Sequence, residues 1–473
     1  MDQPKACFVP ETYYVVCHIS MEVAMRYCLC DFQGEIVTQE DQCYEVARLE
    51  WNRAINKYPL IIVYCECVED VQEAIRWTRR YHISIRIRSG GHNYEGYSIG
   101  DCILVIDVSP MNTVEIDEER KLVKVGGGVK NRELYDAIST KGYPFPGGTC
   151  PTVGVSGYAL GGGWGLSTRY FGLGCDSLLE IQLVAANGRL ITANEHCNRK
   201  IFWACRGAGG GNFGVIVSMT FRLPDKVTGV TLFEIYVGDA TRQKQKAFLS
   251  LWQSWIRDVP SKINMQARIY NTPQENIYIY GRGICYGSIE ETRNLLLPFY
   301  GLCEIQMTYG SFFEAITRVQ SSYPSYDYFK STGRFVDRYF DEEEIETLLD
   351  IVNGPRPIGS TETSIGIYGL GGKTQEKRSI DTAFYYRNAD YILNMQSIWN
   401  DNLYKEANVQ WVEEYFPKLY KLTEGSYVNF PYSELKQYEK EYFGENKYAL
   451  QYIKSIYDPE NLFCFPQSIQ PLC

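Results

Sequence analysis

Apolar residues recur along the chain at two spacings, and these spacings distinguish its helices from its strands. Across residues 69–81 the apolar positions follow the 3.6-residue period of a helix, so we expect a helix there. Across residues 83–88 isoleucine alternates with polar residues, which predicts a strand with one buried face. That strand leads directly into RSGGHNYEGYS, in which His92 follows two glycines.

Residues 122–128 predict another strand that runs into glycines, and the segment after it has the pattern of a helix. We expect Asn131 to be the N-cap of that helix and Gly142 to end it. The Asn-Gly pair at positions 187–188 lies between two apolar runs, which is typical of a β-hairpin. Alternation over residues 215–221 predicts one more strand.

Beyond Pro224 amphipathic helices alternate with strand-like runs. Helical spacing occurs at about residues 241–256, 289–299, 341–352 and 402–421. The strand-like runs are NIYIYGRGICYG, SIGIYGLGG, DTAFYYR and DYILNMQSIW. This order predicts an α+β fold with an antiparallel sheet covered by helices on one face.

The composition indicates a soluble globular protein of two or three domains. The chain has 473 residues, of which 45% are hydrophobic and 22% are charged. No apolar run approaches the ~18 residues that a membrane helix needs, and the N-terminus lacks the basic start of a secretory signal, so we expect a cytoplasmic location. The net charge of −10 disfavours nucleic acid and anionic membranes as partners.

The 16 cysteines are expected to be mostly reduced thiols, because no signal peptide directs the chain to an oxidising compartment. The pairs Cys28-x-Cys30 and Cys65-x-Cys67 lack further His or Cys ligands at zinc spacing. We therefore predict no metal site.

Three glycine clusters lie beside predicted strands. The first, GGGVKN (126–131), opens a helix, but Asn131 occupies the third glycine position of a dinucleotide fingerprint, which disfavours a nicotinamide site. The second (147–165) and third (207–215) are interrupted by larger residues, unlike a flexible linker. Their backbone N–H groups can approach an anion closely, so we favour a phosphate cradle.

Two loop motifs, RSGGHNY (88–94) and GTCPTVG (148–154), resemble those of the berberine-bridge-enzyme-like flavin oxidases, a branch of the vanillyl-alcohol-oxidase-type FAD proteins. The C-terminal stretch YFGENKYALQYIKSIYDPENLFCFPQSI is also similar to that family. The resemblance covers nearly everything from about residue 35 onward. It implies four parts: an N-terminal extension (1–34), an FAD-binding domain of the PCMH type with two subdomains (35–224), a substrate-binding domain (225–425) and a C-terminal module (426–473) that returns to the FAD-binding domain.

The resemblance implies that His92 is bonded to the 8α carbon of FAD and Cys150 to its C6 carbon. A neutral imidazole and a thiolate are both nucleophiles, and the oxidised flavin ring is an electrophile. At Val153, a small side chain goes with access of O2 to the reduced flavin, although a valine that simply packs is the alternative. The other residues that we assign to FAD binding are Arg88, Ser89, Gly90, Gly91, Asn93, Tyr94, Ser98, Gly148, Thr149, Gly154, Gly157, Gly161, Gly162, Gly214, Val215 and Asn429.

The chain departs from the family at Phe430, where several members have the tyrosine that acts as the base. Phenylalanine has no ionisable group and cannot accept a proton. Tyr427 and Tyr432 are the candidate replacements, while packing at the domain junction is the alternative role of Tyr427. Asn394 and Gln396, on a strand expected to face the flavin, are candidates for orienting the substrate.

The resemblance implies an FAD-dependent oxidase that removes a hydride from an alcohol, a sugar or a related small molecule, with O2 as the oxidant and H2O2 as a product. Two alternatives remain. Phe430 and the unusual first 34 residues motivate a flavoprotein with a structural role, for example in a spore coat. The other is a dehydrogenase that passes electrons to an acceptor other than O2. The sequence does not indicate an oligomeric state.

Overall fold

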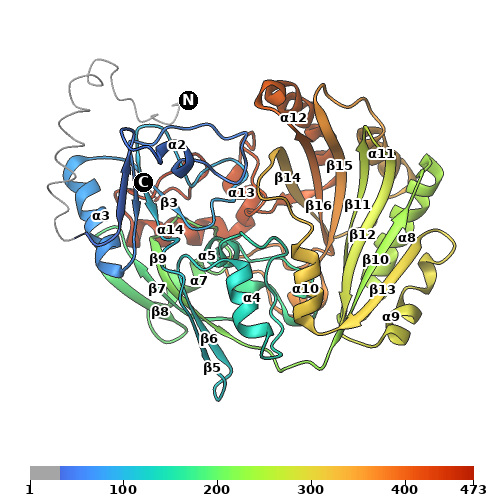
Figure 1. Cartoon of the computed structure of the whole chain (residues 1–473), viewed down its shortest axis with the longest axis horizontal. Coiled ribbons are helices and arrows are strands. Elements are labelled where there is room, and N and C mark those ends of the chain that lie inside the picture. Colours follow the sequence, from blue (N-terminus) through green and yellow to red (C-terminus); the bar gives the residue numbers. More distant parts are fainter. Residues whose placement is uncertain (1–31, 473) are drawn as a thin grey trace.

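The computed structural model describes residues 32–472, so the predicted N-terminal extension lies almost wholly outside the described residues, together with Cys28 and Cys30. The described part forms three sheets: two small ones side by side and one large one beside them (Figure 1). Within this part, no helix is both long enough and apolar enough to cross a membrane.

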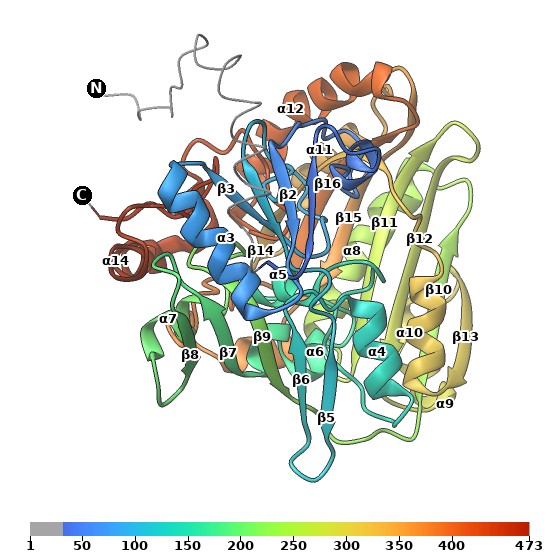
Figure 2. The ribbon, with the colours of Figure 1, turned by 60° about the vertical axis from the view of Figure 1, so that its left-hand side comes forward.

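The smallest sheet has the strand order β1-β2-β4-β3, in which β1 is antiparallel and the other strands are parallel. Helix α3 packs against it and buries the apolar positions that predicted a helix (Figure 2). The bounds are β1 (Glu35–Thr38), α2 (Tyr44–Ala47), β2 (Ile61–Tyr64), α3 (Val68–Tyr81), β3 (Ile85–Arg88) and β4 (Leu104–Asp107).

The second sheet is antiparallel, with the order β5-β6-β9-β7-β8. The Asn-Gly pair closes the predicted hairpin, because Gly188 adopts a φ of +77° that glycine tolerates. The N-cap prediction was wrong by one residue: α4 begins at Asn131 and its N-cap is Lys130. The bounds are β5 (Val114–Asp117), β6 (Leu122–Gly126), α4 (Asn131–Ser139), α5 (Val155–Leu160), α6 (Thr168–Phe171), β7 (Leu178–Val184), β8 (Leu190–Asn194), α7 (Arg199–Ala204) and β9 (Val215–Arg222).

The large sheet is antiparallel, with the order β13-β10-β12-β11-β15-β16-β14-β17. Helices α8, α11 and α12 pack on one of its faces (Figure 1), and the other face turns toward the smaller sheets. The bounds are β10 (Val230–Val237), α8 (Arg242–Asp258), β11 (Ile263–Thr272), β12 (Asn276–Cys285), α9 (Ile289–Leu295), β13 (Glu304–Gly310), α10 (Phe312–Gln320), β14 (Tyr328–Val336), α11 (Glu342–Val352), β15 (Ser360–Gly369), β16 (Tyr391–Trp399), α12 (Lys405–Leu422) and β17 (Glu424–Ser426).

One predicted strand is absent from the described residues: DTAFYYR (381–387) is a loop. The side chains of this loop pack against the part of the chain that forms the smaller sheets. Phe384 lies against Gly207, whose φ of +133° and close backbone contact leave no room for a side chain. Arg387 forms a buried ion pair with Asp176 at 2.7 Å. The aromatic residues that suggested a strand therefore serve tertiary packing.

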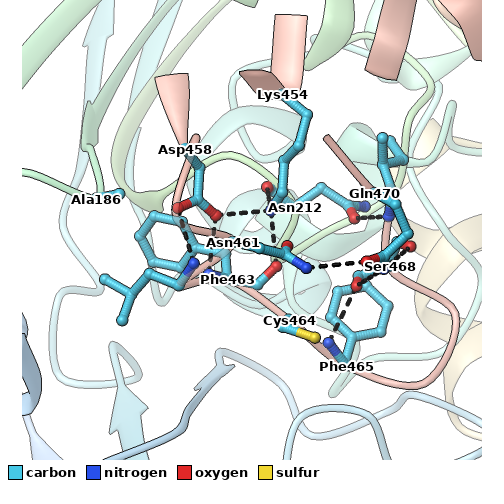
Figure 3. A network of polar contacts seen from close by, with 12 residues as sticks. Ala186, Asn212, Lys454, Asp458, Asn461, Phe463, Cys464, Phe465, Ser468 and Gln470 are labelled. Carbon is cyan, nitrogen blue, oxygen red and sulfur yellow. Dashed lines mark hydrogen bonds and ion pairs between the residues drawn. The ribbon is translucent and has the colours of Figure 1, made fainter. Parts of the chain in front are cut away.

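The C-terminal segment crosses back to the smaller sheets through α13 (Tyr438–Phe443) and α14 (Lys447–Tyr457), and α14 contacts α7 (Figure 2). A buried polar network then fixes the chain end (Figure 3). The ammonium of Lys454 donates to Asp458 Oδ2 at 2.7 Å, to the Phe463 carbonyl at 2.8 Å and to the Asn212 carbonyl at 2.7 Å. Because Asn212 belongs to the third glycine cluster, this network joins the C-terminus to that cluster.

Candidate functional site

A cavity of about 710 Å³ lies between the smaller sheets and the open face of the large sheet. Its walls come from both motif loops, from the third glycine cluster and from two C-terminal stretches, 427–431 and 463–467. Strands β11, β12, β15 and β16 form its floor. This volume falls within the roughly 300–1,000 Å³ typical of small-molecule and cofactor sites.

The two motif loops meet backbone to backbone, and glycine makes this possible. A Cβ atom at Gly90 would collide with the backbone of Gly154 and with the Thr152 carbonyl at 2.7 Å. The Ser89 hydroxyl donates to the Gly127 carbonyl at 3.0 Å and so joins the first of these loops to the first glycine cluster. The sequence thus brings loops that are some sixty positions apart into one wall of the cavity.

His92 and Cys150 contact the same hydroxyl group, that of Thr152. The distance from Thr152 Oγ1 is 2.7 Å to His92 Nε2 and 3.7 Å to Cys150 Sγ. His92 Nε2 and Cys150 Sγ therefore cannot lie further apart than these two distances combined. Trp51 stacks on the imidazole, with ring centroids 5.0 Å apart and planes inclined by 24°. The imidazole and the thiol therefore lie at the same place on the cavity wall.

His92 and Cys150 differ in protonation state, and therefore in how readily each can act as a nucleophile. Burial lowers the pKa of His92 to about 3, with a smaller contribution from the charge of Lys130, so the imidazole is neutral near pH 7. Burial raises the pKa of the Cys150 thiol, and hydrogen bonds from Thr152 and Val153 only partly oppose this. The imidazole is thus already nucleophilic, whereas the thiol must first lose its proton.

Most residues predicted to bind FAD line the cavity. They are Ser89, Gly90, Gly91, His92, Asn93, Tyr94, Ser98, Gly148, Thr149, Cys150, Val153, Gly154, Gly157, Gly214 and Asn429. A Cβ atom at Gly157 would project into open space, so the backbone is bare at this position of the cavity wall. The volume, the bare backbone and the two paired nucleophiles fit the predicted FAD. In the first cluster, Cβ atoms at Gly126, Gly127 and Gly128 would strike backbone carbonyls, so these glycines serve close backbone packing.

Four predicted residues do not line the cavity but support its walls: Arg88, Gly161, Gly162 and Val215. Arg88 is buried behind the His92 loop, where it pairs with Asp107 and lies 3.8 Å from Glu50. The carboxylate of Glu50 in turn accepts a hydrogen bond from the Ser98 hydroxyl at 2.7 Å. Gly161 leaves space for the side chain of Asn429, which a Cβ atom there would overlap.

Of the candidate catalytic residues, Gln396 and Tyr427 line the cavity, whereas Asn394 and Tyr432 do not. The Tyr427 oxygen accepts hydrogen bonds from the backbone N–H groups of Gly163 (3.1 Å) and Trp164 (3.0 Å), and Asn429 Nδ2 lies 3.1 Å from it. Burial raises the pKa of Tyr427 to about 12. These contacts favour the packing role of Tyr427.

Asn394 and Tyr432 are held away from the cavity by their own contacts. The Asn394 amide donates to Ser331 Oγ at 2.8 Å and to the Thr332 carbonyl at 2.7 Å. Tyr432 is 2% exposed, and its ring centroid lies 4.2 Å from that of Phe416. Catalytic roles for Asn394 and Tyr432 remain predictions, and the positions of the two side chains outside the cavity wall disfavour them.

Phe430 lines the cavity in a stack of aromatic rings. Its ring is nearly parallel to that of Tyr94, with centroids 5.2 Å apart, and meets Tyr368 edge-on at 5.6 Å. Gly333 makes room below it, because a Cβ atom there would lie 2.7 Å from the Phe430 ring. The ring without a hydroxyl group thus lies between two phenols.

The floor of the cavity contains polar residues that the sequence analysis missed. Gln266, Arg268 and Tyr270 alternate on β11, and Gln266 pairs across the sheet with Arg282 on β12. The period-two spacing of these polar residues could have predicted that they lie on one face of β11. Only the pairing of β11 with β12 shows that this face is shared with Arg282. The missed floor and wall residues are Trp51, Gln266, Arg268, Tyr270, Tyr280, Arg282, Tyr323, Asp327, Glu362 and Tyr368.

Arg268 connects a phenol and a carboxylate on this floor. It donates a hydrogen bond to the Tyr368 hydroxyl group, and its guanidinium lies 3.5 Å from Glu362 Oε1. That carboxylate oxygen also accepts from Gln396 Nε2 at 2.8 Å. Burial raises the pKa of Tyr368, and the charge of Arg268 opposes this rise.

Comparisons with known proteins identify the family of the chain. Residues 59–194 match the family model of an FAD binding domain, and residues 426–470 match the model called berberine and berberine like. The FAD-linked oxidoreductase YgaK of Bacillus subtilis (strain 168) is 34% identical over 449 residues, which cover 93% of this chain and 97% of that protein.

Solved structures show the same fold. The wild-type BBE-like 1 protein of Physcomitrella patens is 28% identical and has a TM-score of 0.87 over 95% of this chain and 99% of that one. Glucooligosaccharide oxidase of Acremonium strictum, described as carrying a 6-S-cysteinyl, 8α-N1-histidyl FAD, has a TM-score of 0.87 at 22% identity, over 95% of this chain and 99% of its own. The predicted α+β fold, with an FAD-binding part and a helix-covered antiparallel sheet, is confirmed.

Proposed function

The chain belongs to the berberine-bridge-enzyme-like family of FAD-linked oxidoreductases, and from this premise we propose that it is an oxidase whose FAD is bonded to both His92 and Cys150. The observation that carries the proposal is the contact of both side chains with the Thr152 hydroxyl group. The bound FAD supplies the acceptor for a hydride from a carbon that bears oxygen, and O2 is the second substrate, with H2O2 as the product.

The contacts of His92 indicate which of its atoms forms the bond. Because Nε2 lies 2.7 Å from the Thr152 hydroxyl, Nδ1 is the nitrogen left for attachment. Stacking on Trp51 restricts rotation of the ring. The glucooligosaccharide oxidase described above has a histidyl and a cysteinyl bond on one flavin, which supports the same pairing here.

The cavity floor offers a proton acceptor in place of the tyrosine that Phe430 lacks. Tyr368 lies edge-on to Phe430, and the Arg268 guanidinium next to its oxygen stabilises a phenolate. We propose that Tyr368 accepts the substrate proton, while Gln396, held by Glu362, orients the substrate. Because burial keeps the pKa of Tyr368 above its usual value, turnover should increase as the pH rises above neutrality.

Val153 supports the use of O2 as the oxidant. It lines the cavity three positions after Cys150, and its side chain is small. A slow reaction of the reduced protein with air would favour the dehydrogenase alternative instead.

The test uses purified protein. We expect its yellow colour to remain with the protein after acid precipitation, and a screen of alcohols and sugars to reveal substrates that bleach the flavin without air and release H2O2 in air. Tyr368→Phe should lower kcat roughly 10²–10⁴-fold at unchanged flavin content, whereas the exposed Tyr448→Phe should not. Loss of all flavin on precipitation would contradict covalent attachment. The absence of turnover with every compound would favour the structural alternative.

A further inference from the structure

Among the residues that the structure describes, one buried arginine of the cavity, Arg282, has no partner of opposite charge. In the described part of the chain, Arg88, Arg334 and Arg387 are buried and each pairs with a carboxylate. Arg169 is also buried, but its guanidinium donates to three backbone carbonyls. Arg282 is only 8% exposed and forms no ion pair among residues 32–472. An unpaired buried charge is costly, so such a group needs a partner.

The guanidinium of Arg282 is only partly satisfied by the protein. Its Nη1 donates to the Val319 carbonyl at 3.2 Å and to the Ser322 hydroxyl. Its Nε is buried and has no hydrogen-bond partner within the described residues. Gln266 lies directly across the sheet from Arg282, and its Oε1 is also buried without a hydrogen-bond partner among the described residues. Within the described part of the chain, the cavity floor thus contains one buried donor and one buried acceptor without a hydrogen-bond partner.

Arg282 lies close to the loop that carries Cys150. Its guanidinium carbon is 5.1 Å from the centre of the Tyr323 ring. The hydroxyl group of Tyr323 in turn lies 2.6 Å from Thr149 Oγ1, and Thr149 precedes Cys150. One aromatic ring therefore separates the charge of Arg282 from this loop, so a group bound to Arg282 belongs to the reacting end of the cavity.

The acidic residues of the cavity do not neutralise Arg282. Glu362 is already engaged by Arg268 at 3.5 Å and by Gln396 at 2.8 Å. Burial raises the pKa of Asp327 to about 7, so this side chain is largely uncharged below neutral pH. The substrate end of the cavity thus keeps a surplus positive charge.

We propose that Arg282 binds a carboxylate of the substrate, which makes the substrate class an alcohol or a sugar that also carries an acid group. This inference rests on the proposed oxidase function. A guanidinium presents paired donors that match the two oxygens of a carboxylate. The surrounding tyrosine rings (Tyr94, Tyr270, Tyr280 and Tyr323) suit a sugar or aryl ring attached to that acid.

Calorimetric titration of the flavin-containing protein with benzoate tests the proposal, with benzamide as the uncharged probe of the same shape. We expect benzoate to bind at least about tenfold more tightly than benzamide, because an unpaired charged donor rejects a neutral analogue. Arg282→Met should weaken benzoate binding at least about tenfold and leave benzamide unchanged. Arg282→Lys should retain part of the preference for benzoate. The control is Arg120→Met, because Arg120 is exposed. This variant should bind both probes as the wild type does.

The flavin content and melting temperature of each variant are measured alongside. If Arg282→Met does not fold, the lysine variant decides: loss of all preference for benzoate overturns the proposal. Equal binding of benzoate and benzamide by the wild type, or full benzoate binding by Arg282→Met, also overturns it. Because the titration needs no turnover, an inactive but flavin-containing protein that still binds benzoate through Arg282 would refute the oxidase function and not the anion site.

Discussion

At the scale of single residues, the hydroxyl group of Thr152 explains how one short loop prepares two different nucleophiles. It holds the neutral imidazole of His92 at 2.7 Å and lies 3.7 Å from the thiol of Cys150. A hydroxyl group can donate to one partner and accept from another, so it can serve both. On the proposed attachment of FAD, Thr152 is therefore a positioning residue.

Thr152→Val should slow formation of the histidyl bond roughly five- to tenfold, because a side-chain hydrogen bond contributes about 1 kcal/mol. Thr152→Ser keeps the hydroxyl group and should restore the bond. The measurement is the fraction of the His92 peptide that carries FAD, followed over time by mass analysis. If the valine variant attaches FAD at the wild-type rate, Thr152 has no positioning role.

Asp327 should make stability depend on pH. Burial raises its pKa to about 7 in the folded protein, whereas an unfolded chain has a value near ~3.9. The folded state thus keeps a proton that the unfolded state releases, so the contribution to stability is full below about pH 4 and is lost as the pH rises to about 7.

Asp327→Asn removes this titration. We expect its melting temperature to exceed that of the wild type by a margin that grows from pH 4 to pH 7 and corresponds to at most about 4 kcal/mol at pH 8. A margin that stays constant over this pH range would show that Asp327 ionises normally.

At the residue scale, contiguous motifs in the sequence marked side chains that the fold brings together. The loops of His92 and Cys150 were identified by short runs of glycine around one reactive side chain, and the two loops meet in the folded chain. Arg282 and Tyr368 lie in ordinary strands, and nothing local marks them. Their significance comes from burial and from missing or unusual partners, which only the folded chain shows.

At the scale of elements, the periodicities predicted most helices and strands, because one face of each is buried. The failure at 381–387 has a physical cause: its aromatic residues pack between two halves of the molecule, so their alternation does not reflect a sheet. The pairing of β11 with β12, which aligns Gln266 with Arg282, could not be read from either strand alone.

The helix α14 depends on a fully buried ion pair between Lys454 and Asp458 (Figure 3). Lys454→Met should destabilise the protein by about 3–5 kcal/mol, because it leaves the carboxylate buried without its cation. Adding Asp458→Asn should recover part of the loss. The exposed Lys436→Met is the control and should change stability by less than about 0.5 kcal/mol. Thermal unfolding measures all of these, and an unchanged midpoint for Lys454→Met would contradict the role of the pair.

At the scale of the whole molecule, the site exists only where separate parts meet. One wall carries the two motif loops, the floor belongs to the large sheet, and the C-terminal segment closes the side that contains Asn429. The sequence resemblance predicted an FAD-binding part, a substrate-binding part and a C-terminal module, and the residue boundaries between these parts remain predictions. Charge placement within the cavity, including the surplus on Arg282, follows from the assembly alone.

The central claim is that one FAD is bonded to two side chains from different loops. Mass analysis of a proteolytic digest of the purified protein tests it most directly. The account predicts one cross-linked species, in which the peptides containing His92 and Cys150 share a single FAD. Two unmodified peptides, or FAD attached at some other position, would contradict it.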